Sequence, residues 1–172
     1  MRGKRKGMLT VLFFIYLAVL TWAILFKMHA PTQILAERLP EPILNLRPFY
    51  RERTGAEFLS FQIQEIRDNI LLFIPMGLYL SLLWRKGTWY GRLLAALAVS
   101  LALETAQYSL RIGRADITDL ITNGTGALMG LGGCKLAEKL LGKRTESALT
   151  YTALVCTVLV LALLSVLIIG NR

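Results

Sequence analysis

The chain has 172 residues, of which 55% are hydrophobic and 18% are charged, and its mean hydropathy is +0.53. A soluble domain of this length would carry more charge and shorter apolar runs, so the composition excludes an ordinary soluble globular protein. The net charge of +9 is no sign of nucleic-acid binding, because the basic residues flank apolar runs and form no patch interleaved with aromatic side chains.

The first apolar run covers residues 8–26 and follows the basic stretch RGKRKG. A secretory signal peptide has the same order of features, but its apolar part is usually about 7–15 residues long and precedes a small-residue cleavage site. This run is longer and no such site follows it. We therefore predict that residues 1–26 form a cytoplasmic basic tail and an uncleaved signal anchor.

Residues 27–68 form a long connection that we place outside the membrane. Prolines at positions 31, 40, 42 and 48 prevent its first half from being one regular helix. Its second half, AEFLSFQIQEIRDN, mixes apolar and polar residues as in an amphipathic helix lying on the outer leaflet. Asp68 and Asn69 would then start the next helix, with Asp68 as a plausible cap.

Four further apolar runs follow. Three of them, residues 69–84, 91–109 and 117–136, form a predicted core over residues 69–136, and Pro75 should kink the first of the three. A basic loop over residues 137–149 leads to a fifth span within residues 150–172. The predicted fold class is all-α, an integral membrane bundle of about five transmembrane helices.

The loop charges predict the orientation of this bundle. Basic residues dominate the N-terminal tail, the loop near residue 86 and the loop after residue 135, whereas the opposite loops are balanced in charge. Because basic loops stay in the cytoplasm, we place the N-terminus inside and the C-terminus outside a bacterial cytoplasmic membrane. The turn at residues 109–116 then faces outward.

Ionisable groups gather around this turn. Asp116 precedes the fourth run as an N-cap, and Asp119 occupies the N3 position of a capping box. Glu104 lies inside a span, where a carboxylate is costly and needs a partner, and Arg111 and Arg114 are the nearest candidates.

The fourth span also presents a close-packing face. Asp119 and Asn123 share that face with Gly126 and Gly130, whose G-x-x-x-G spacing is typical of tight helix contacts in membranes. With Pro75 and Gly77 on the second span, these glycines are the predicted helix-packing positions.

The polar residues of three spans should therefore meet near the outer surface. The candidate binding residues are Asn69, Glu104, Gln107, Arg111, Arg114, Asp116, Asp119 and Asn123. Two interpretations stay open at this point. The cluster is either a polar pocket that binds a ligand or an ion-pair network that fastens the hairpin.

Several of these motifs resemble one known family. The elements are Asn-Leu-x-Pro-Phe at residues 45–49, Asn-x-x-x-Phe-x-Pro-x-Gly at 69–77, Glu-x-x-Gln at 104–107, Gly-Arg-x-Asp-x-x-Asp-Leu at 113–120 and Asn-x-x-Gly at 123–126. In this order they resemble the VanZ family of bacterial membrane proteins. The family is named for a protein linked to resistance to teicoplanin, a lipid-tailed glycopeptide that acts on cell-wall precursors. The resemblance implies a membrane protein that lowers sensitivity to such antibiotics.

Three functions are compatible with the sequence. The first is a non-enzymatic protein whose outer pocket binds a cell-wall precursor, a lipid or a glycopeptide. The second is an intramembrane enzyme acting on a lipid-linked phosphate, with Mg²⁺ held by Glu104, Asp116 and Asp119 and the phosphate clamped by Arg114. The third is an ion-coupled transporter with Glu104 as its proton site. The sequence contains no recognised nucleophile, metal or cofactor motif, which favours the first.

Overall fold

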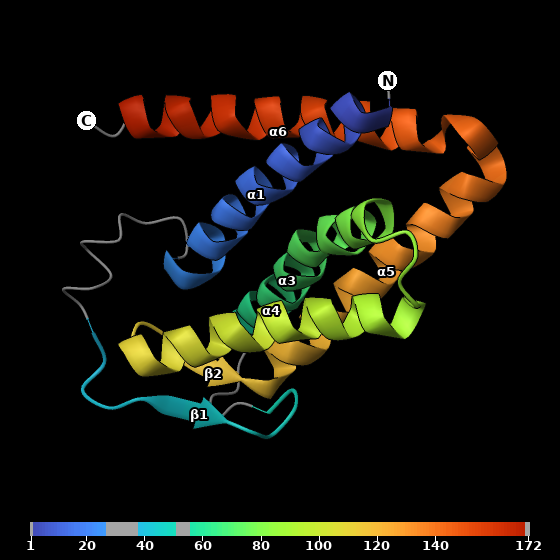
Figure 1. Ribbon diagram of the computed structural model, residues 1–172. Helices are drawn as coiled ribbons and strands as arrows, with labels where there is room; N and C mark the ends of the chain where they lie inside the picture. Colours follow the sequence, from blue (N-terminus) through green and yellow to red (C-terminus); the bar gives the residue numbers. More distant parts are fainter. Residues whose placement is uncertain (1, 27–37, 51–55, 171–172) are drawn as a thin grey trace.

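The computed structural model describes residues 2–26, 38–50 and 56–170. Helices make up most of this part of the chain, in agreement with the predicted all-α class (Figure 1). They are α1 Arg2–Phe26, α3 Ala56–Leu83, α4 Trp89–Leu110, α5 Ile117–Leu141, the short η1 Gly142–Arg144 and α6 Thr145–Gly170. Two short strands, β1 Ile43–Asn45 and β2 Arg114–Asp116, were not predicted from the sequence and pair in parallel.

Three helical segments are long and apolar enough to cross a membrane, namely Arg5–Phe26, Leu59–Leu83 and Trp89–Leu110. The predicted total of about five spans is therefore not confirmed. Helix α5 falls outside the set because threonine, asparagine and glycine residues dilute its apolar content.

Helix α3 differs from its prediction at its N-terminal end. It runs without interruption from Ala56 to Leu83, so the expected interfacial helix and the second span are one helix of 28 residues. Asp68 therefore lies inside a helix and is not its cap. The physical reason is that residues 56–69 contain neither proline nor glycine, so no residue there ends the helix. Pro75 lies within α3, which continues through it to Leu83.

Helices α3 and α5 share the most extensive interface, and their backbones touch. A Cβ added at Gly126 would come within 2.2 Å of the Ile70 carbonyl oxygen, and one at Gly130 within 2.1 Å of the Ile74 oxygen. On the facing helix, a Cβ at Gly77 would lie 2.1 Å from the Ala127 oxygen. No side chain fits between the two helices at these positions, so glycine on both sides allows the close approach.

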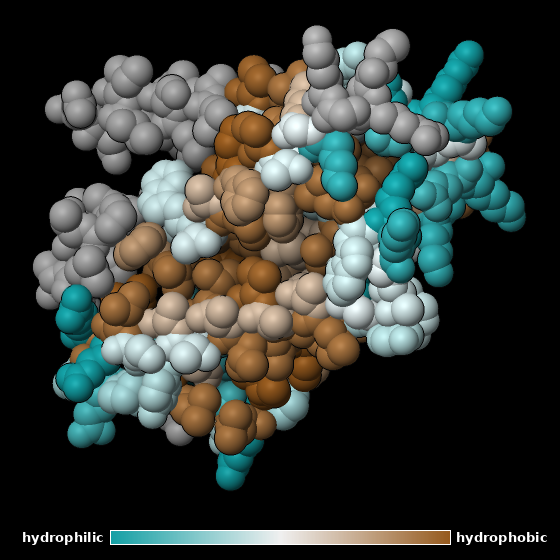
Figure 2. Space-filling model, in the orientation of Figure 1, coloured by the Kyte–Doolittle hydropathy of each residue, from teal (hydrophilic) through white to brown (hydrophobic). Residues whose placement is uncertain are grey.

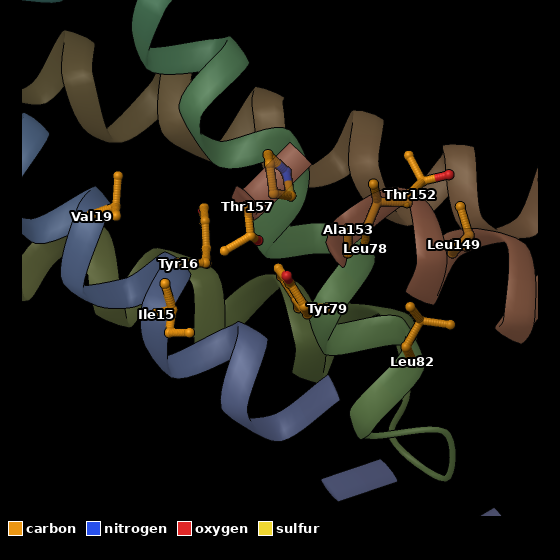
Figure 3. A pocket seen from close by; sticks show the side chains of 11 residues that line it. Ile15, Tyr16, Val19, Leu78, Tyr79, Leu82, Leu149, Thr152, Ala153 and Thr157 are labelled. Carbon is orange, nitrogen blue, oxygen red and sulfur yellow. The ribbon is translucent and has the colours of Figure 1, made fainter. Parts of the chain in front are cut away.

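Apolar side chains cover the middle of the face in Figure 2, and hydrophilic residues gather at its upper right and lower left. Between α1, α3 and α6 lies an apolar cavity of about 190 Å³, whose lining includes Tyr16, Leu78 and Leu149 (Figure 3). At that end of the bundle the Arg85 guanidinium lies 3.3 Å from the Glu146 carboxylate, which ties the turn after α3 to the start of α6.

Candidate functional site

The turn between α4 and α5 has a defined geometry. Helix α4 ends at Leu110. Its C-cap residue, Arg111, adopts the left-handed conformation (φ 57°) and donates its backbone N–H to the carbonyl oxygens of Gln107 and Tyr108. The N–H of Ile112 also donates to the Gln107 oxygen, at 3.2 Å. These bonds satisfy the last carbonyls of the helix and direct the chain into β2 and then α5.

Strand pairing brings the Asn-Leu-x-Pro-Phe segment to this turn. Asn45 is opposite Asp116 in the register of β1 and β2, and the Leu39 N–H donates to the Arg111 oxygen at 2.8 Å. The amide of Asn45 donates to Asp116 Oδ2 at 2.9 Å and to the Tyr50 oxygen at 3.2 Å, and its Oδ1 accepts the Arg47 N–H. Asn45 thus fixes both its own loop and the cap of α5. Asn45 was not among the predicted site residues. The sequence did offer a signal for it, because Asn45 is the first residue of the Asn-Leu-x-Pro-Phe motif.

Asp116 is the N-cap of α5, as its position before the apolar run predicts. Its Oδ1 accepts the Thr118 N–H at 2.8 Å, and Asp119 lies in the first turn of the helix. The N–H of Asp116 itself donates to Glu104 Oε2 at 2.8 Å. The partner of the Glu104 carboxylate is therefore a backbone amide and not Arg111 or Arg114, which were its expected partners. A backbone N–H that donates to an ionised carboxylate forms a charge-assisted hydrogen bond, so this amide gives Glu104 a buried partner.

A polar cavity of about 620 Å³ opens beside this cap, between α1, α3, α4 and the start of α5. We call it the polar cavity. Five of the eight predicted binding residues line it: Asn69, Gln107, Arg114, Asp116 and Asp119. Glu65 and Asp68 on α3 add two carboxylates that the prediction did not include, and Ile24, Phe61 and Leu72 supply apolar walls.

The other three predicted residues lie elsewhere. The Arg111 guanidinium donates to the Pro40 oxygen at 3.1 Å. Asn123 is buried in the bundle, where its amide donates to Ser100 Oγ at 2.9 Å. Glu104 lines a separate, mostly apolar cavity of about 210 Å³, which it shares with Asp116. For Glu104 and Arg111 the described contacts are structural, whereas the five residues of the polar cavity surround open space.

Gln107 connects the polar cavity to α1. Its Nε2 donates to the Ile24 oxygen at 3.0 Å, and the side chain is only 5% exposed. Its Oε1 is buried and has no hydrogen-bond partner among the described residues. Because the Ile24 carbonyl can only accept, it fixes which end of the amide carries the nitrogen.

The model of the family described as VanZ/LLP1 matches residues 13–138. Protein VanZ from Enterococcus faecium is 32% identical over 149 residues, which are 86% of this chain and 86% of that protein. The chain belongs to the VanZ/LLP1 family. No solved structure matches it.

Family membership and three apolar helices of sufficient length together identify this VanZ/LLP1 protein as a membrane protein. The polar cavity lies inside the part of the chain that matches the family. Among the described residues, no group of three or more His, Cys, Asp or Glu side chains is arranged to hold a metal ion.

Proposed function

We propose that this VanZ-family protein binds the polar headgroup of an amphiphilic envelope component in the polar cavity, at the outer face of the bacterial cytoplasmic membrane. The single observation that carries the proposal is the cavity itself. It brings Asn69, Gln107 and Asp119, from three different helices, around one space large enough for an organic headgroup.

The position of the cavity suits an amphiphile. Its walls include segments of all three candidate spans, α1, α3 and α4, and apolar residues such as Phe61 and Leu71 lie beside the charged ones. A headgroup in the cavity could keep its hydrocarbon tail against the apolar helix surfaces. The bound molecule would then not have to leave the bilayer, which reduces the free-energy cost of recognition.

Such binding would affect antibiotics that share this chemistry. A lipid-tailed glycopeptide is itself an amphiphile that works at the outer face, and its cell-wall target is attached to a lipid. Binding of either the drug or a lipid component would lower the concentration available for the drug's action. We propose that expression of the protein lowers sensitivity to teicoplanin in this way, without catalysis.

The test is antibiotic susceptibility in a deletion strain that expresses plasmid-borne variants. Wild-type protein should raise the inhibitory concentration of teicoplanin, and Asn69→Leu and Asp119→Asn should remove most of that increase, because each deletes a polar group of the cavity. Glu138→Gln, an exposed acid at the far end of α5, is the matched control and should behave as wild type.

Membrane levels of each variant are measured in parallel. If both cavity variants are present at wild-type levels and protect fully, the cavity does not carry the function and the proposal is wrong.

A further inference from the structure

The cavity of about 190 Å³ between α1, α3 and α6, which we call the apolar cavity, shares no described lining residue with the polar cavity. Side chains of all three helices surround it in Figure 3, among them Ile15, Leu78 and Ala153. Its described lining contains hydroxyl groups but no charged side chain. An apolar cavity of about 150 Å³ in a soluble protein stays dry and binds benzene, so this space suits a hydrocarbon segment of about six carbon atoms.

The two cavities lie along one face of α3. Six residues of this face line them in order, with Glu65, Asp68 and Leu72 at the polar cavity and Pro75, Tyr79 and Leu82 at the apolar cavity. Successive members of this series are three or four residues apart, which places them on the same side of the helix. The step from Leu72 to Pro75 is about 4.5 Å along the helix axis, so the two cavities are neighbours.

Helix α1 borders both cavities in the same order. Ala23 lines the polar cavity, and Val19 and Ile15 line the apolar cavity at steps of four residues. Tyr16 lies at the boundary, because its side chain lines the apolar cavity and its hydroxyl donates to the carbonyl oxygen of Leu72, a residue of the polar cavity, at 2.8 Å. The facing sides of α1 and α3 thus lead from the polar cavity past Tyr16 to the apolar cavity.

We propose that the apolar cavity holds the end of the hydrocarbon chain of an amphiphile whose headgroup lies in the polar cavity. This inference rests on the proposed function and adds a site for the ligand's tail. The middles of residues 65–72 and 75–82 are about 15 Å apart along α3, which equals the depth of one leaflet's hydrocarbon, so a chain of ordinary lipid length reaches the apolar cavity. The chain comes from the bilayer, so its binding is driven by the dispersion contacts that an empty cavity lacks.

The experiment photolabels the full-length protein in phosphatidylcholine nanodiscs with two forms of tetradecylglycerol. One carries a diazirine at the end of its chain, and the other carries it next to the glycerol. Labelled residues are mapped by mass spectrometry, and only labelling that an excess of unmodified tetradecylglycerol removes is counted. The chain-end probe should label Val19 and Ala153 at the apolar cavity, whereas the headgroup probe should label Phe61 and Leu71 at the polar cavity.

Filling the apolar cavity should exclude the chain. Val19→Phe and Ala153→Phe add volume from two different helices, and each should lower the counted chain-end labelling about fivefold, because a close-packed space cannot admit a chain. Val11→Phe and Val155→Phe are the matched controls on the same helices and should label as wild type does, since Val11 is 59% and Val155 is 57% exposed and neither lines the cavity. The wild-type labelling needs no substitution, so it tests the inference even if a filled variant does not fold.

The inference is overturned if counted chain-end labelling is absent from the apolar cavity, or if both filled variants fold and keep it. It is also overturned if the chain-end probe labels the apolar cavity but the headgroup probe does not label the polar cavity, because the occupant is then the chain of a surrounding lipid. Loss of chain-end labelling alone counts only against the tail site. The proposed function is judged separately, by the teicoplanin susceptibility of Asn69→Leu and Asp119→Asn.

Discussion

Residues at the turn between α4 and α5 form two sets of hydrogen bonds, one around the N-cap of α5 and one between α4 and α1. Asp116 caps α5 with one oxygen and receives the Asn45 amide with the other, and Glu104 holds the backbone N–H of Asp116. These bonds tie the end of α4 to the start of α5 and join both to Asn45, which is far away in the sequence. Gln107, one helical turn beyond Glu104, instead joins α4 to α1 and leaves an acceptor unused. Glu104 and Gln107, which belong to the same Glu-x-x-Gln motif, thus contact different elements of the fold.

The hydrogen bond between Glu104 and the Asp116 N–H predicts a difference between two substitutions of Glu104. Glu104→Gln keeps an oxygen that accepts the Asp116 N–H, so its free energy of unfolding should change little. Glu104→Leu leaves that buried N–H unpaired and should cost about 1–3 kcal/mol. The measurement is the thermal unfolding midpoint of the purified protein in detergent, and equal midpoints for the two variants would contradict the assigned hydrogen bond.

Helix α5 shows how one element serves both packing and the site. Its first turn carries Asp119 at the polar cavity, and its middle packs against α3 through Gly126 and Gly130. The glycine contacts hold the first turn of α5 beside α3, which supplies Asn69 to the same cavity. A wider separation of the two helices would therefore also move the walls of the cavity.

This packing predicts opposite results for glycines on one helix. Gly126→Ala or Gly130→Ala puts a methyl group against a carbonyl oxygen of α3 that cannot turn away, and should cost about 1–3 kcal/mol or more. Gly132→Ala and Gly133→Ala meet nothing within 4 Å and should be neutral or stabilising by up to about 1 kcal/mol. Thermal unfolding of the four variants checks this, and a uniform response would contradict the α3–α5 interface.

The sequence predicts those features of the elements that depend on local patterns. The cap at Asp116 can be predicted because it depends on one residue before an apolar run. A helix over the first half of α3 was also predicted, but its continuity with the span that follows was not, although residues 56–69 contain neither proline nor glycine. The β1–β2 pairing could not be predicted from local sequence patterns, because each strand has three residues and the two strands are far apart in sequence.

For the whole molecule, four of the described helices, α1, α3, α4 and α5, contribute residues to the wall of the same cavity. Ile24 near the end of α1, Asn69 on α3, Gln107 near the end of α4 and Asp119 at the start of α5 all line it. This agrees with spans that alternate in direction, which is how the sequence predicts a shared layer of polar groups. The sequence could not predict which of these residues line the cavity. Glu104, Arg111 and Asn123 form their hydrogen bonds with other segments of the chain, and such contacts do not follow from local patterns.

The orientation of this bundle in the membrane is the central claim that the proposed function requires. It is tested most directly by single cysteines in a Cys134→Ser, Cys156→Ser background, labelled with a membrane-impermeant maleimide in intact cells. We predict that Arg47→Cys and Arg114→Cys, at the cavity end, are labelled in intact cells, whereas Arg85→Cys and Arg144→Cys are labelled only after permeabilisation. The reverse pattern would place the polar cavity in the cytoplasm and contradict the account.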